Sequence, residues 1–217
     1  MSLTAGIVGL PNVGKSTLFN AITNSRIEAA NYPFATIEPN VGVVEVKDER
    51  LDQLSALFEP KKTIYTTFEF TDIAGLVKGA SKGEGLGNKF LANIREVDAI
   101  CHVVRCFEDS DITHVLEGID PIRDIEIINY ELIMADLATA ETRLSKTQKK
   151  VETTKEKNAL KEYELLKRIK DVLNEGKLIK TMDLDEEEVE ILRQYHFLTL
   201  KPVIYVANIK DEEVNEP

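Results

Sequence analysis

The sequence reads Gly9-Leu10-Pro11-Asn12-Val13-Gly14-Lys15-Ser16-Thr17 near its beginning, and this stretch decides the fold. It fits the spacing G-x-x-x-x-G-K-[ST] of a phosphate-binding loop, or P-loop, in which glycines let backbone N–H groups turn toward an anion. Lys15 places a positive charge over the phosphates, and Ser16 offers a hydroxyl to Mg²⁺. The helix that follows points its positive dipole end at the same phosphates. The stretch therefore predicts a phosphate-binding site.

The segments around this loop predict an α/β sheet. Residues 3–8 read as a buried strand and residues 18–22 as a helix, which is the setting that the loop requires. Further strands are predicted at 41–46, 66–73, 99–107 and 198–207, and shorter helices at 50–58 and 90–94. Strands that alternate with helices are typical of a mostly parallel sheet between helical layers. We therefore expect a three-layer α/β sandwich.

Residues 122–175 predict a pair of long helices inserted into that sheet. The apolar residues of this charged segment recur at the seven-residue or three-four spacing of a helical seam: Leu137, Leu144, Val151, Leu166, Ile169 and Leu173. The polar stretch 153–158 separates the helices, so we expect an antiparallel coiled-coil hairpin rather than a dimer zipper. Gly176 suits the C-terminal cap, and Asp183 or Asp185 suits the N-cap of an acidic helix beyond it.

These elements divide the chain into three segments. We expect a nucleotide-binding domain at residues 1–121, a helical insertion at 122–196 and a continuation of the first domain at 197–217. A sheet of this kind needs one more strand, so the sequence is expected to be part of a longer chain.

Composition restricts the classes of protein that fit. Of the 217 residues, 43% are hydrophobic, which suffices for a core, and the net charge of −11 repels nucleic acid on average, so no DNA partner is expected. No run approaches the roughly 18 apolar residues of a membrane span, and no signal peptide opens the chain. Cys101 and Cys106 are predicted on opposite faces of one strand as buried, reduced thiols. We expect a cytoplasmic protein without a membrane partner.

Two further motifs point to a metal ion and to a switch. Asp72-Ile73-Ala74-Gly75 fits D-x-x-G at a strand end, where the carboxylate can hold the water shell of Mg²⁺ and the Gly75 N–H can meet the γ-phosphate. Thr36 is predicted in a loop, where a threonine can ligate Mg²⁺ in the triphosphate state only. The alternatives are an ordinary strand-end turn for Asp72 and a surface residue for Thr36.

The stretch Asn208-Ile209-Lys210-Asp211 stands where a base-reading N-K-x-D motif is expected, after a buried strand. Asn208 and Asp211 fit the motif, but Ile209 replaces the lysine whose stem stacks on the base. An aspartate accepts from the two N–H donors of guanine, whereas adenine offers one donor and one acceptor there. The identity of the base therefore stays open, and a polar turn is the alternative.

The sequence offers few candidate residues for activating the attacking water. Leu76 follows D-x-x-G where Ras-like enzymes often use a glutamine to orient the water, so hydrolysis is expected to be slow. His114 is the candidate beside Lys15 for a catalytic role, with a solvated loop histidine as the alternative. His102 and His196 are expected to be structural. Asn12 raises a second hypothesis, a K⁺ ion bound beside the phosphates.

Three stretches together resemble the YchF branch of the Obg-related P-loop GTPases. They are the P-loop stretch, Asn-Tyr-Pro-Phe-Ala-Thr-Ile-Glu-Pro-Asn-Val-Gly at 31–42, and Asp-Ile-Ala-Gly-Leu-Val-Lys-Gly-Ala-Ser-Lys-Gly-Glu-Gly-Leu-Gly-Asn at 72–88. The resemblance runs from Ala5 to about Glu213. It implies a Ras-like nucleotide domain interrupted by a coiled-coil hairpin, and a C-terminal TGS domain that this chain lacks.

The resemblance also implies roles for single residues. It places Ser16 and Thr36 on Mg²⁺ and Ile209 near the base. Members of this branch favour ATP over GTP and usually carry N-x-x-E as the base-reading motif, so Asp211, followed by Glu212, leaves GTP more open. Together with the motifs above, the residues predicted to contact the nucleotide are Asn12, Val13, Gly14, Lys15, Ser16, Thr17, Gly75, Asn208, Ile209 and Asp211.

Three functions are compatible with these features. The leading one is a slow Mg²⁺-dependent hydrolase of ATP or GTP that switches between two loop states by positioning phosphates and stabilising charge. The second is a binding module in which the nucleotide only sets the conformation and the hairpin docks a partner. The third adds a contact of the basic segment 143–157, including Lys149 and Lys150, with RNA or the ribosome, for which a solvated helical surface is the alternative.

Overall fold

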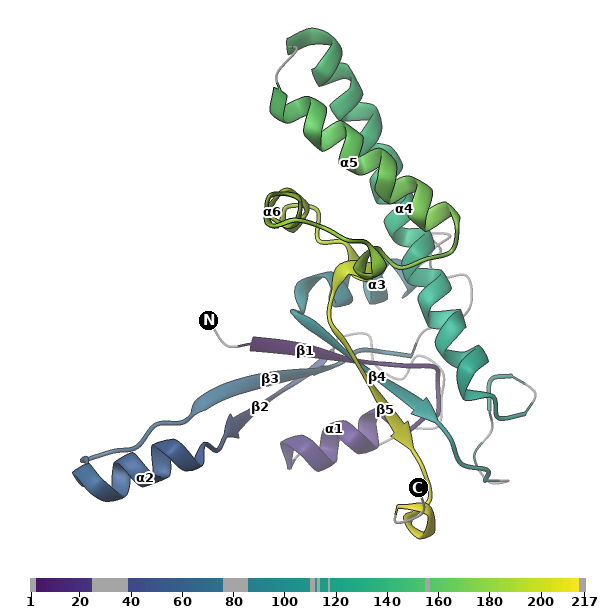
Figure 1. Ribbon diagram of the computed structural model, residues 1–217. Coiled ribbons are helices and arrows are strands. Elements are labelled where there is room, and N and C mark those ends of the chain that lie inside the picture. The colour runs from purple at the N-terminus through teal and green to yellow at the C-terminus, as the bar shows by residue number, and fades with distance from the viewer. Residues whose placement is uncertain are drawn as a thin grey trace. The chain divides into compact units, whose positions relative to one another are not determined.

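The computed structural model describes residues 3–24, 39–75, 86–109, 112, 114–116, 118–154 and 157–214 (Figure 1). The chain divides into two compact units. The first unit comprises Met1–Gly75, Val97–Ile119 and Val203–Pro217, and the second comprises Leu76–Glu96 and Asp120–Pro202. Residues 76–96 thus group with the helical insertion, whereas the sequence analysis places them in the first domain. Within the second unit, Lys201 Nζ donates to the carbonyl of Arg95 at 3.1 Å, which ties this segment to the end of the insertion.

The first unit contains a five-stranded sheet in the order β2-β3-β1-β4-β5 (Figure 1). The strands are β1 (Leu3–Val8), β2 (Asn40–Val46), β3 (Thr66–Asp72), β4 (Ala99–Arg105) and β5 (Val203–Asn208). β1 runs parallel to β3 and β4, and β4 runs parallel to β5, whereas β2 is antiparallel to β3. The predicted α/β class with a mostly parallel sheet is confirmed.

Two details of the strands differ from the sequence analysis. β5 was expected to be buried, but it is the last strand of the described sheet, and its side chains Ile204 and Tyr205, which point to opposite faces, are 66% and 45% exposed. It begins at Val203, after a short 3-10 turn at Leu198–Leu200. Cys101 is buried on β4, but Cys106 lies beyond the end of that strand and is only half-buried, so its predicted place on the strand is wrong.

The helices of the first unit have different degrees of burial. α1 (Lys15–Thr23) contacts β2 and β3 and buries Phe19. α2 (Glu49–Phe58) buries none of its residues, and its N-terminus is capped by Asp48, whose carboxylate accepts from the Arg50 N–H at 2.9 Å. α1 is therefore the helix that connects the P-loop to the sheet.

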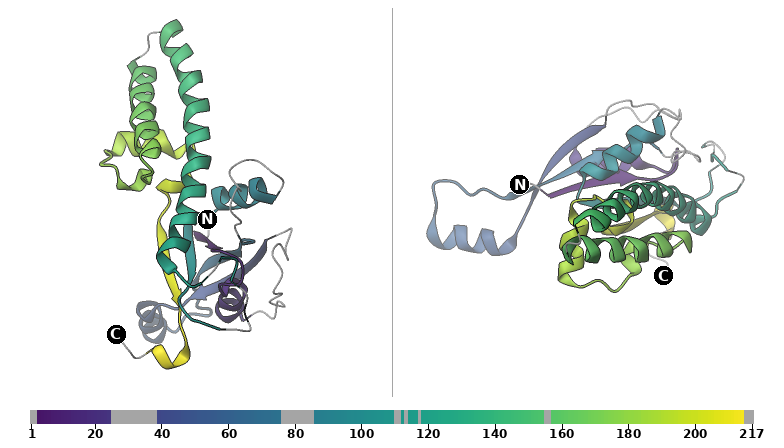
Figure 2. Two further views of the ribbon diagram at one scale, coloured as in Figure 1. Left: turned by 90° about the vertical axis from the view of Figure 1, so that its right-hand side faces the viewer. Right: turned by 90° about the horizontal axis from the view of Figure 1, so that it is seen from above.

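The second unit is helical, and its two long helices lie side by side (Figure 2). α4 (Pro121–Thr154) and α5 (Lys157–Asn174) form the predicted hairpin, which is confirmed. Its core consists of buried side chains, with Leu137 and Leu144 packed against them: Ile133, Ala140, Leu165, Leu166, Ile169, Leu173, Ile179, Leu192, Tyr195 and Phe197. The predicted seam thus forms the interior of this unit except at Val151, which is half-buried and lies outside the cluster.

Local signals fix the ends of the helices in this unit. Gly176 has a φ of 73°, and its N–H donates to the carbonyl of Leu173 at 3.0 Å, so it caps α5 as predicted. Asp185 caps α6 (Glu186–Arg193) through a capping box with Glu188, which decides between the two predicted aspartates. The remaining helix is α3 (Leu86–Glu96). Within the described part of the chain, no helix is both long and apolar enough to span a membrane.

Candidate nucleotide-binding site

The P-loop lies between the end of β1 and the start of α1, as its motif requires. Asn12 and Gly14 have φ values of 60° and 94°, in the left-handed region that asparagine tolerates and glycine adopts freely. A Cβ at Gly14 would also lie 2.4 Å from Nδ2 of Asn208. Both the backbone conformation and the neighbouring side chain therefore require glycine at this position.

Lys15 is a buried cation at the first position of α1. Its side chain is only 8% exposed, and Nζ donates to the carbonyl of Leu10 at 2.7 Å. Burial lowers the pKa of Lys15 to about 8, although the nearby Asp72 carboxylate acts in the opposite direction. Because a buried ammonium bound to a neutral carbonyl carries a desolvation cost, a phosphate anion beside it would be strongly favoured.

Ser16 and Asp72 meet at the carboxyl end of β3. The Ser16 hydroxyl donates to Oδ2 of Asp72 at 2.8 Å, and Asp72 is buried. Burial raises the pKa of Asp72, while the Ser16 hydrogen bond and the Lys15 charge lower it. A hydroxyl and a carboxylate are hard oxygen donors, and Mg²⁺ is usually held by one or two such groups together with phosphates and water. These two residues therefore fit a magnesium ion, whereas the predicted third ligand, Thr36, lies outside the described residues.

The site has no other metal-binding cluster in the part of the chain that the structure describes. No group of three or more His, Cys, Asp or Glu side chains gathers there in a way that could hold a metal. Gly75 is close to the same centre, because a Cβ at this position would lie 3.1 Å from Nζ of Lys15. The structure thus brings four predicted residues together, namely Lys15, Ser16, Asp72 and Gly75.

Asn208 joins the predicted base-reading stretch to the P-loop. Its side-chain Nδ2 donates to the carbonyl of Val13 at 2.9 Å, and its own carbonyl accepts from the Cys106 N–H at 2.8 Å. Ile209 and Asp211 follow it as exposed residues, with Asp211 at the start of a 3-10 turn (Asp211–Glu213). Asn208 therefore braces the phosphate loop, and the contacts of Ile209 and Asp211 with a base stay predictions.

His114 is bonded within its own loop. Its Nδ1 accepts from the Leu116 N–H at 3.1 Å and lies 2.9 Å from the Leu116 carbonyl. His102 is buried in β4 with its ring centre 5.5 Å from that of Tyr205, and His196 is exposed with a φ of 51°. Leu76 lies outside the described residues, so the activation of water stays a prediction.

Arg105 is a buried residue that the sequence analysis missed. It is 1% exposed, and its guanidinium donates to three carbonyls of the segment after β4, those of Phe107, Asp109 and Ile112, at 3.0 to 3.1 Å. The guanidinium therefore bonds three described backbone groups that lie between β4 and His114 in the sequence. The available signal was an arginine at the end of an otherwise apolar strand.

Together, the strand, the glycine-containing loop, the buried lysine and the Ser16–Asp72 pair define a P-loop nucleotide-binding domain. Comparison with known proteins agrees with this class, because the family model of 50S ribosome-binding GTPases matches residues 4–129. The chain therefore belongs to this family of P-loop GTPases, and the resemblance to its YchF members is confirmed.

Individual relatives give the extent of the match. The ribosome-binding ATPase YchF of Bacillus subtilis is 58% identical over 217 residues, which are the whole chain and 59% of that relative. Its counterpart from Haemophilus influenzae is 56% identical over 98% of the chain and 58% of the relative. The solved structure of the Schizosaccharomyces pombe YchF GTPase has a TM-score of 0.78 and 44% identity, covering 98% of this chain and 58% of that one. The chain thus spans about three-fifths of the length of these relatives.

Proposed function

We propose that the protein is a Mg²⁺-dependent purine nucleoside triphosphatase that prefers ATP to GTP and works as a conformational switch. The observation that carries the proposal is the convergence of Lys15, Ser16 and Asp72 in one buried centre. A lysine that contacts a neutral carbonyl and a hydroxyl that contacts a carboxylate are the groups that phosphates and Mg²⁺ require. We place such a protein in the cytoplasm.

Each group of this centre has a separate task in the proposed reaction. Lys15 positions the β- and γ-phosphates and balances their charge, and the backbone N–H groups of residues 12–17 bind their oxygens. Ser16, Asp72 and Thr36 would hold Mg²⁺, which supplies charge neutralisation when it is bound. Catalysis of this kind needs positioning and electrostatic stabilisation rather than a covalent intermediate.

Slow turnover follows from the residue after D-x-x-G. Leu76 has no group that could orient water, so His114, or a K⁺ ion beside Asn12, would have to raise the rate. Phosphate release is measured for the unchanged protein and for His114→Ala, in potassium and in sodium buffer. Equal rates for both proteins would remove His114 from the mechanism, and equal rates in both buffers would remove K⁺.

The second candidate function is a nucleotide-dependent binding module without hydrolysis, and the Leu76 replacement favours it for this chain. It is distinguished by nucleotide affinity in the absence of phosphate release. The proposed ATP preference is tested by competitive binding of ATP and GTP in the presence of Mg²⁺. The names of the relatives include both ATPase and GTPase, and equal or tighter binding of GTP is the outcome that would overturn the preference.

Association with the ribosome is proposed because curated relatives carry the name ribosome-binding ATPase. Ribosomal RNA is a candidate contact of Lys149 and Lys150, which are exposed near the end of α4. Co-sedimentation with ribosomes at increasing salt tests this contact. Reversal of both charges should abolish salt-sensitive binding, and unchanged sedimentation would exclude these two lysines.

A further inference from the structure

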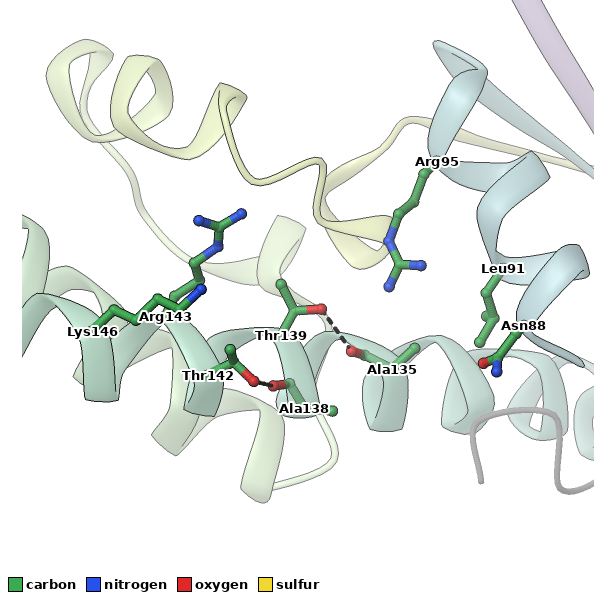
Figure 3. Close-up of a pocket in the computed structure, with 9 residues that line it drawn as sticks. All are labelled: Asn88, Leu91, Arg95, Ala135, Ala138, Thr139, Thr142, Arg143 and Lys146. Carbon is green, nitrogen blue, oxygen red and sulfur yellow. Dashed lines mark hydrogen bonds between the residues drawn. The ribbon is translucent and has the colours of Figure 1, made fainter. Parts of the chain in front are cut away.

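A pocket of about 390 Å³ lies between α3 and α4 in the second unit (Figure 3). Three cationic side chains line it, Arg95 from α3 and Arg143 and Lys146 from α4, together with the hydroxyls of Thr139 and Thr142. No carboxylate is among the described residues of this lining. The pocket is therefore electropositive although the chain carries a net charge of −11.

Several cations elsewhere in the same unit are paired with carboxylates. Lys161 Nζ lies 2.7 Å from Glu187, and Lys170 Nζ lies 3.0 Å from Glu141. In contrast, none of the three pocket cations has a carboxylate oxygen within 4.0 Å among the residues that the structure describes. Three cations without an ion pair to a described carboxylate thus line one concave place.

Neighbouring groups hold the two arginines in position. The guanidinium of Arg143 lies 5.1 Å from the centre of the Tyr195 ring, a cation–π contact. Arg95 is attracted to the buried Asp136, whose oxygens accept from the Leu198 and Thr199 N–H groups at 2.9 and 2.7 Å. A guanidinium has five N–H donors, so Arg95 can bond a ligand while this attraction is kept.

We propose that this pocket binds a phosphate group of a nucleotide, either a free one or one within an RNA strand. Arginine binds phosphate through two parallel N–H···O bonds, and Lys146 adds a point charge. The volume lies in the range of small-ligand sites, and the lining includes the buried Leu91 and Ala135. Binding of an RNA phosphate rests on the proposed association with the ribosome, whereas binding of a free nucleotide phosphate does not.

Two probes test the site while the P-loop is saturated with Mg²⁺ and a non-hydrolysable ATP analogue. Inorganic pyrophosphate is titrated by calorimetry, and a fluorescent single-stranded RNA of about ten nucleotides is titrated by anisotropy. Arg143→Gln combined with Lys146→Gln should weaken the binding of either probe at least about tenfold. Loss of two phosphate contacts should also reduce the salt slope for RNA by about 1.4.

The matched control is Lys61→Gln combined with Lys62→Gln, which removes the same charge at two exposed positions outside the pocket. This control should weaken binding less than about twofold. Lys146→Gln alone leaves the Arg143–Tyr195 contact in place and should weaken probe binding by a smaller factor. This single variant therefore tests the pocket even if the double variant does not fold. If pyrophosphate binds and RNA does not, the ligand of the pocket is a free phosphate compound. If RNA binds and pyrophosphate does not, the ligand is an RNA strand.

The proposal is overturned if neither probe binds, or if the control pair weakens binding as much as the pocket pair. The RNA titration can be repeated without the ATP analogue, and the pyrophosphate titration can be repeated on Lys15→Ala. A protein that fails to bind or hydrolyse ATP would therefore contradict the proposed function and still leave the pocket testable.

Discussion

The P-loop centre and the apolar core of the helical hairpin bury different kinds of side chain. Around the P-loop, Lys15 and Asp72 are nearly inaccessible to solvent and are held by a carbonyl and a hydroxyl. In the hairpin, Leu165, Leu166 and Ile169 are buried, while ion pairs lie at the surface. Apolar burial stabilises a fold, whereas burial of a charge costs free energy unless a partner offsets it. The difference indicates that the P-loop is organised for its ligand and the hairpin core for stability.

The largest expected effect is on the hairpin core. Leu166→Ala should lower the free energy of unfolding by about 2–5 kcal/mol, because Leu166 is fully buried in the core cluster. Urea denaturation followed by the helical circular dichroism signal measures it. Leu160→Ala on the same helix is the control, since Leu160 is 50% exposed and should cost less than about 1 kcal/mol. Equal losses of unfolding free energy in the two variants would contradict the assignment of the core. The nucleotide affinity of both variants should stay unchanged.

The second effect concerns the buried lysine. Lys15→Ala should weaken the binding of ATP about 100-fold, or about 2.7 kcal/mol, because charge-assisted bonds to the phosphates are lost. The melting temperature without nucleotide should not fall, since a buried ammonium and its desolvation cost are removed. Titration calorimetry and thermal unfolding measure the two quantities, with the exposed Lys62→Ala as control. A clear fall in melting temperature would contradict the conclusion that the P-loop buries Lys15 for its ligand rather than for stability.

A smaller effect is expected from pH. With the pKa of Lys15 lowered to about 8, a bound triphosphate favours the ammonium and raises this pKa again, so binding takes up a proton. Affinity should fall about tenfold from about pH 7 to about pH 9, with uptake of about 0.7 proton near pH 8.5. Calorimetry in buffers of different ionisation enthalpy measures the uptake. Lys15→Arg stays charged and should lose this dependence, and zero uptake by the unchanged protein would contradict the lowered pKa.

The smallest effect is expected at the surface of the hairpin unit. Lys161 and Glu187 form an ion pair at 2.7 Å, but both side chains are more than half exposed. A double-mutant cycle with Lys161→Ala and Glu187→Ala should give a coupling of about 0.2–1 kcal/mol, falling at high salt. A coupling as large as the Leu166 effect would show that charges rather than apolar contacts stabilise this unit.

Features with a local cause were predictable from the sequence. The P-loop, the D-x-x-G turn, the hairpin seam and the caps at Gly176 and Asp185 each depend on residues a few positions apart. The direction of β2 and the exposure of β5 depend on neighbours distant in the sequence, so the local pattern could not show them. Valine-rich strands have the same appearance in both directions and at both edges of a sheet.

The residues of the nucleotide-binding site divide in the same way into those that a local motif predicts and those that only the structure shows. Lys15, Ser16, Asp72 and Gly75 were named from motifs, and the structure brings them together. The role of Asn208 in holding Val13, rather than only reading a base, was not foreseen because it requires the spatial position of β5. Arg105 and Asp136 were missed because buried charges that bond backbone groups form no sequence motif.

The bond from Asn208 to Val13 joins residues 195 positions apart, with the whole of Asp120–Pro202 between them. Synthesis proceeds from the N-terminus at about 5–20 residues per second, so the P-loop is made roughly 10–40 seconds before the strand that braces it. A nascent chain therefore carries an unbraced phosphate loop throughout that interval. Full nucleotide affinity should arise only after translation has passed Asn208, which makes ligand capture a late event in the maturation of this protein.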